Sequence, residues 1–179
     1  MGPRHARRRG TRAMAYHSNR SVTERGEAVG YEARVLEGLD AGFNCAESTV
    51  SAFAEEVDLP RDVGIRVATA LGGGIAQTSN TCGLVIGGAI VLSWALGRTD
   101  PQDTASMERA YQYVARLIQY VETERGSILC PGILGSDLVD EESRRCAIDS
   151  GEFTRRCRIA ATDIAGVLER LLHEANKGT

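Results

Sequence analysis

Apolar residues recur at intervals of three and four positions along most of the chain, the spacing of amphipathic helices. The first predicted helix covers 22–39 and ends where Gly42 can adopt the left-handed conformation. A second helix follows at once, with Asn44 as its N-cap and Glu47 completing a capping-box pattern, so that Cys45 becomes its first residue. No run of period-two alternation predicts a strand. The expected fold is all-α, a compact helical bundle whose cysteines lie on irregular connections.

Further helices follow the same pattern, and proline or glycine marks their ends. A short helix after Pro60 stops at Gly72-Gly73-Gly74, and Thr99-Asp100-Pro101 opens a long helix that ends near Gly126. The predicted apolar faces are Val63, Val67, Ala70 and Leu71 in the short helix; Met107, Ala110, Tyr111, Val114, Leu117, Ile118 and Val121 in the long helix; and Ile159, Ile164, Val167, Leu168, Leu171 and Leu172 in the closing helix.

The longest apolar stretch, 83–97, falls short of the roughly 18 to 20 residues that span a bilayer. It is therefore predicted to be a buried core helix. Ser79, Asn80 or Thr81, at the end of the polar loop 72–81, is expected to cap it.

The first twenty residues are rich in arginine and contain no apolar segment of a secretory signal. They are expected to form a disordered head, most of which would be absent if translation starts at Met14. Residues 21–175 are expected to form a single helical redox domain. The whole chain of 179 residues has a formal net charge of −3, and the part after the head is more acidic still. A nucleic-acid partner is therefore not expected. The arginines of the head are Arg4, Arg7, Arg8, Arg9 and Arg12.

The chain contains five cysteines, an odd number that does not suit an extracellular disulfide framework. A reducing, cytoplasmic location is expected. Four of the cysteines fall at predicted helix N-termini, where unpaired N–H groups and the helix dipole favour a thiolate. Each could instead be a small buried apolar residue. The four are Cys45, Cys82, Cys130 and Cys157.

Cys157 has a second feature that favours the thiolate, since Arg155, Arg156 and Arg158 surround it in sequence. Cys146 lies inside a predicted short helix and is interpreted as incidental, with a reserve role as an extra thiol.

The spacing of the cysteines does not specify what they hold, because the chain has neither the short knuckles typical of zinc sites nor a C-x-x-C pair. Distant cysteines can converge in a helical bundle. Four thiolates at one point would suit an iron–sulfur cluster, and two would suit a disulfide.

Other candidate sites are weaker. Gly72-Gly73-Gly74 lacks the lysine and preceding strand of a phosphate loop and is interpreted as a turn or a close packing contact. Gly83 and Gly87 lie on one helix face, which indicates that another helix or a cofactor approaches closely there. The three histidines, His5, His17 and His173, have no ligand spacing.

The cysteine pattern resembles the C_GCAxxG_C_C family of redox-active proteins over roughly 28–172. The first family cysteine matches Cys45, the motif matches Cys82-Gly83-Leu84-Val85-Ile86-Gly87, and the others match Cys130 and Cys157. Leu84 replaces the motif alanine, while the cysteine and both glycines are kept. The resemblance implies redox activity. The cluster-bearing part of split-Soret cytochromes is similar to this family, so the resemblance also implies a [2Fe-2S] centre in a homodimer. The chain lacks C-x-x-C-H, which implies that it carries no c-type haem.

Three functions are consistent with the sequence. In the first, the four cysteines bind an iron–sulfur cluster for electron transfer or redox sensing, with Gly83 and Gly87 beside the cofactor. In the second, the chain is a thiol–disulfide oxidoreductase without a metal. In the third, it is a helical scaffold with incidental cysteines. The sequence does not decide whether the cysteines bind zinc, and it identifies neither the electron donor nor the acceptor.

Overall fold

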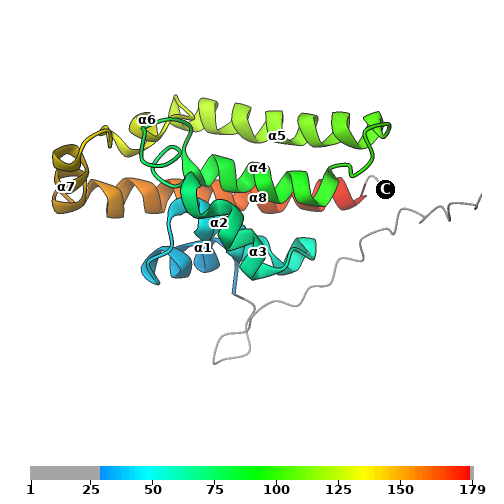
Figure 1. The fold of residues 1–179 in the computed structure, drawn as a ribbon, viewed down its shortest axis with the longest axis horizontal. Coiled ribbons are helices and arrows are strands. Elements are labelled where there is room, and N and C mark those ends of the chain that lie inside the picture. The colour runs from blue at the N-terminus through cyan, green and yellow to red at the C-terminus, as the bar shows by residue number, and fades with distance from the viewer. Residues whose placement is uncertain (1–28, 178–179) are drawn as a thin grey trace, which may run out of the picture.

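The computed structural model describes residues 29–177, and the regular secondary structure in this part is helical (Figure 1). The expectation of an all-α fold is therefore confirmed. None of the helices in 29–177 is long and apolar enough to cross a membrane. The α-helices are α1 (Tyr31–Asp40), α2 (Cys45–Phe53), α3 (Arg61–Ala68), α4 (Gly83–Leu96), α5 (Thr104–Arg125), α6 (Cys130–Leu134), α7 (Glu141–Asp149) and α8 (Arg158–Lys177). Short 3-10 helices η1 (Glu55–Val57) and η2 (Thr69–Leu71) follow α2 and α3, and a π-helix, η3 (Phe153–Cys157), precedes α8.

Helix α4 lies at the centre of the arrangement and contacts α2, α5 and α8. Figure 1 shows α4, α5 and α8 running side by side, with α1, α2 and α3 against one side of this layer. The core contains completely buried side chains, among them Phe53, Leu84, Leu92, Leu117 and Leu168.

The local signals around the first cysteine are confirmed. Gly42 adopts a φ of +93° directly after α1. The side chain of Asn44 accepts hydrogen bonds from the N–H groups of Ala46 and Glu47, and the Glu47 carboxylate accepts one from the Asn44 N–H. This complete capping box makes Cys45 the first residue of α2. The predicted start of the first helix and the Arg-rich head lie outside the described residues.

Several predicted faces and boundaries are wrong in detail. Val63 and Val67 are exposed, and α3 instead buries Gly64 and Ala68, because Gly64 leaves room for Val50 and Leu59. Tyr111 of α5 and Ile159 of α8 also point to solvent.

Helix starts differ as well. Asp103 caps α5, so this helix starts after Pro101, and Cys82 itself occupies the N-cap position of α4. Cys130 is the first residue of α6, in keeping with its predicted place at a helix N-terminus.

Helices α2 and α4 approach each other at two glycines. A Cβ added to Gly83 would lie 3.1 Å from the N atom of Ala46, and one added to Gly87 would lie 2.8 Å from the Cβ of Thr49 and 3.0 Å from the carbonyl oxygen of Ala46. The space over both glycines is thus filled by α2, one of the two occupants that the sequence indicated.

Gly87→Ala is expected to lower the free energy of unfolding by about 1–3 kcal/mol, because the new methyl group meets backbone and a β-branched side chain that cannot move away. Urea unfolding measures the change.

Gly88→Ala is the matched control on the same helix. Its methyl group meets the flexible end of Leu117, and alanine has the higher helix propensity, so the loss should be clearly smaller. Equal losses for the two variants would contradict the close approach of α2 and α4.

Candidate redox site

All four predicted cysteines are buried, each exposing 6% or less of its surface, and all are free thiols. They come from four separate segments. Cys45 starts α2, Cys82 caps α4, Cys130 starts α6, and Cys157 ends η3 immediately before α8. Cys146 is exposed and lies on α7.

The contact between α2 and α4 brings the first two cysteines together. The Cβ of Cys45 lies 3.2 Å from the place where a side chain on Gly83 would begin, directly beside Cys82. The charge of Cys45 is among the causes that raise the pKa of Cys82.

Two backbone hydrogen bonds fix Cys130 beside Cys82. The Cys82 N–H donates to the carbonyl of Ile128 and the Cys130 N–H donates to that of Asn80, both at 2.8 Å. Thr81 and Leu129 form an antiparallel bridge between these bonds. This short cross-connection holds 80–82 alongside 128–130, although nearly fifty residues separate them.

Cys157 meets Cys45 directly. Its side chain interacts with that of Cys45 and is the largest cause of the raised pKa of Cys45. Cys157 ends the π-helix η3, whose wide turn packs against α6 as well as α8. A π-turn changes the direction in which the following side chains point, and such turns are frequent at functional sites. The four cysteines therefore form one buried group, which we call the cysteine cluster.

Burial, and not helix position, decides how these free thiols ionise. The pKa of Cys45 is raised by its hydrogen bond to Cys157 and by burial. Burial also raises the pKa of Cys82, and that of Cys130 to about 11, with Cys45 adding to both shifts. The expectation that helix N-termini hold these sulfurs as thiolates is thus wrong for Cys45, Cys82 and Cys130 as free thiols.

The N–H groups at the helix starts do act in the expected direction. Backbone N–H groups of Cys45 and Gly73 lower the pKa of Cys45, and those of Leu84 and Val85 lower the pKa of Cys82. Their effect is smaller than that of desolvation, which penalises a buried charge.

The arginines next to Cys157 in sequence have carboxylate partners. Arg155 and Arg156 pair with Glu152, the latter at 3.5 Å, and Arg158 pairs with Asp40 of α1. Position in sequence alone suggested a cationic environment for Cys157, and it could not show where the guanidinium groups point.

The loop 72–81 covers the cysteine cluster in an unusual conformation. Residues 73–77 all have positive φ, and three of them, Ile75, Ala76 and Gln77, are not glycine. Left-handed backbone is costly for such residues and is typical of functional segments. Gly72 packs against Asn44, and the backbone N–H of Gly73 lowers the pKa of Cys45. The glycine run predicted a close contact, but nothing in the sequence predicted the left-handed segment.

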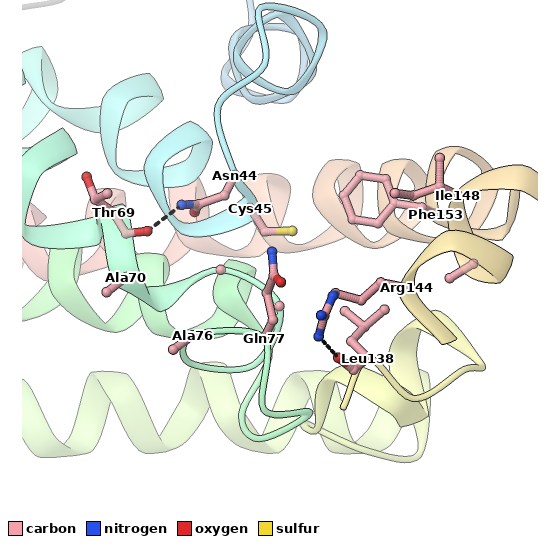
Figure 2. Close-up of a pocket in the computed structure, with 13 residues that line it drawn as sticks. Asn44, Cys45, Thr69, Ala70, Ala76, Gln77, Leu138, Arg144, Ile148 and Phe153 are labelled. Atoms are coloured by element: carbon pink, nitrogen blue, oxygen red, sulfur yellow. Dashed lines mark hydrogen bonds between the residues drawn. The ribbon is translucent and has the colours of Figure 1, made fainter. Parts of the chain in front are cut away.

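A cavity of about 380 Å³ lies beside Cys45. In Figure 2 the Cys45 sulfur points toward the space between Gln77, Arg144 and Phe153. The cavity is bounded by α2, the loop 72–81, α7 and η3. Its lining residues are scattered along the chain, so no sequence pattern marks it.

No histidine joins the cysteine cluster within the described residues: His173 lies on α8, and His5 and His17 are outside the described part. Among residues 29–177, no group of three or more His, Cys, Asp or Glu side chains is placed to hold a metal ion.

An all-helical fold with one buried group of four distant cysteines defines a class of redox-active cysteine proteins. The family model described as "Putative redox-active protein (C_GCAxxG_C_C)" matches residues 43–171, and the chain belongs to this family. Comparisons with curated proteins and with solved structures gave no match.

In reduced, metal-free protein at about pH 7.5, we expect iodoacetamide to modify Cys146 before Cys45, Cys82 or Cys130. Only a thiolate reacts, and the last three thiols are buried and protonated. Modification of Cys130 should become about tenfold faster per pH unit up to about pH 11, where its raised pKa lies. Peptide mass spectrometry measures both. Labelling of a buried cysteine ahead of Cys146 would contradict this description of the cluster.

Proposed function

We propose that the cysteine cluster binds an iron–sulfur cluster, [2Fe-2S] in type, and that the protein acts in electron transfer or redox sensing. The observation that carries the proposal is that Cys45, Cys82, Cys130 and Cys157, from four separate segments, interact with one another in one buried place.

The residue types fit this cofactor, although the four sulfurs are not arranged around a single metal ion in this structure. Thiolates are the usual protein ligands of iron–sulfur clusters, and each iron of a two-iron cluster takes two of them. The chain offers two pairs. Cys45 and Cys157 interact through their side chains, and the segments of Cys82 and Cys130 are joined by the bridge between Thr81 and Leu129. The raised pKa values describe free thiols, and a bound metal would take up these sulfurs as thiolates.

A bound cluster would supply one-electron chemistry, and the chain's own residues would set its surroundings. Burial by α2, α4 and α6 excludes water from the sulfurs. The N–H groups of Gly73, Leu84 and Val85 point at Cys45 and Cys82 and would stabilise negative charge there. As part of the same proposal, we place the protein in the cytoplasm, where thiols stay reduced, and assign it a homodimer like the cluster-bearing part of split-Soret cytochromes.

Protein purified without oxygen should contain iron and sulfide and absorb visible light. Serine at any of the four buried cysteines should remove most of this absorption, because an oxygen donor replaces a thiolate ligand. Iron and sulfide assays with a visible spectrum measure it.

Cys146→Ser is the matched control and should keep the wild-type iron content, since Cys146 is exposed and does not belong to the cysteine cluster. Protein that stays colourless and iron-free after reconstitution would overturn the proposal.

A second function is favoured by one specific interaction, that between the side chains of Cys45 and Cys157. These two thiols could form a disulfide by exchange: one thiolate attacks a partner's disulfide, and the second then attacks the mixed disulfide. The pair loses two electrons and two protons, and the partner's disulfide becomes two thiols. Cys82 and Cys130 have no assigned part in this reaction.

This second function predicts one defined disulfide, Cys45–Cys157, in protein treated with a mild disulfide oxidant, and mass spectrometry of digested protein would identify it. Ala at either position should abolish it, whereas Cys82→Ala should leave it intact. Pairing spread over all five cysteines would count against exchange.

A further inference from the structure

The cavity beside Cys45 has walls of different chemistry. One wall is apolar and consists of Leu138, Ala147, Ile148 and Phe153. Ile148 is 66% exposed, so its side chain lacks the cover that a buried apolar residue normally has. At about 380 Å³, the cavity lies near the lower end of the range for small-molecule sites, roughly 300–1,000 Å³.

The same side of the cavity also carries one positive charge, Arg144 of α7. Arg144 donates from Nη1 to the carbonyl of Leu138 at 2.9 Å, which fixes its guanidinium at the cavity (Figure 2). An arginine has five N–H donors, so this bond leaves several for a ligand. Gln77 points into the same space and offers a neutral amide.

No acidic residue lines the cavity among the described residues. Asp140 lies outside it, at the start of α7, where its carboxylate accepts the Ser143 N–H. The charge of Arg144 is a smaller cause of the lowered pKa of Asp140 than this hydrogen bond. The local charge therefore favours an anionic ligand.

The strained loop positions one side of the cavity. Residues 73–77 carry Gly73 to the Cys45 sulfur and Gln77 into the cavity, and both lie in left-handed backbone. Hydrogen bonds such as Ala76 N–H to the Ala70 carbonyl, 2.7 Å, hold the loop in this form.

We propose that this cavity binds a small organic carboxylate with an apolar body about the size of one ring. The carboxylate pairs with the Arg144 guanidinium, which matches its planar shape, and the apolar body lies against Phe153 and Leu138. The bound molecule then sits directly beside Cys45, where it can act as a substrate or effector of the redox centre. The binding itself does not depend on what the four sulfurs hold.

The test is a titration of the full chain, as purified, followed by methyl NMR. The probes are benzoate, benzamide, which has the same shape without the charge, and inorganic phosphate, which has charge without the apolar body. We expect benzoate to bind about fivefold more tightly than benzamide, the effect of one partly screened ion pair. Phosphate should bind more weakly than benzoate, and the largest shifts should fall on Leu138, Ala147 and Ile148.

Arg144→Gln should remove the preference for benzoate over benzamide. Arg145→Gln is the matched control, because Arg145 is adjacent, exposed and outside the cavity lining, and it should keep the preference. Arg144→Lys should keep part of the preference for benzoate. This variant provides the test if Arg144→Gln does not fold.

Equal affinities for benzoate and benzamide in the unmodified chain would overturn the proposal. So would shifts centred elsewhere, phosphate binding as tight as benzoate, or a preference that survives in Arg144→Gln. Because the titration detects no electron transfer, its failure is distinct from a failure to find iron and sulfide.

Discussion

The close approach of α2 to α4 is the constraint on which the site depends. Glycine at 83 and 87 lets the backbone of α2 rest on α4, with the Ala46 N atom 3.1 Å from where a Gly83 side chain would begin. This contact places the first residue of α2, Cys45, over the N-terminus of α4, where Cys82 stands. The bridge between Thr81 and Leu129 then adds Cys130, and the π-turn before α8 adds Cys157. One helix–helix contact thus organises cysteines from four parts of the chain.

The electrostatics of the site follow from competition between burial and backbone dipoles. N–H groups at the starts of α2 and α4 favour thiolates, but desolvation is stronger and keeps the free thiols neutral. A ligand that takes up sulfur as thiolate reverses this balance, because it replaces lost hydration with a direct bond. The same burial that makes the free thiols unreactive would protect a bound cluster from water, and the N–H groups would then stabilise the negative charge that it carries.

Local signals in the sequence predicted much of the fold. The capping box at Asn44 and Glu47, the left-handed Gly42 and the helical spacing of apolar residues are short-range features, and the structure contains them. The cysteine set was predictable because its members share a helix-edge position and a family motif. Long-range features were not predictable: the pairing of 80–82 with 128–130, the partners of Arg155 and Arg158, the left-handed run 73–77 and the cavity all depend on contacts between distant segments. Val63 and Val67 look apolar and inward-facing in the sequence, yet Gly64 decides which side of α3 is buried.

Crystals of protein purified without oxygen offer the most direct test of the central claim, through anomalous diffraction measured at the iron absorption edge. The account predicts iron between the sulfurs of Cys45, Cys82, Cys130 and Cys157, with α2 still packed on Gly83 and Gly87. Iron bound to other side chains, or these four sulfurs too far apart to share one centre, would contradict it.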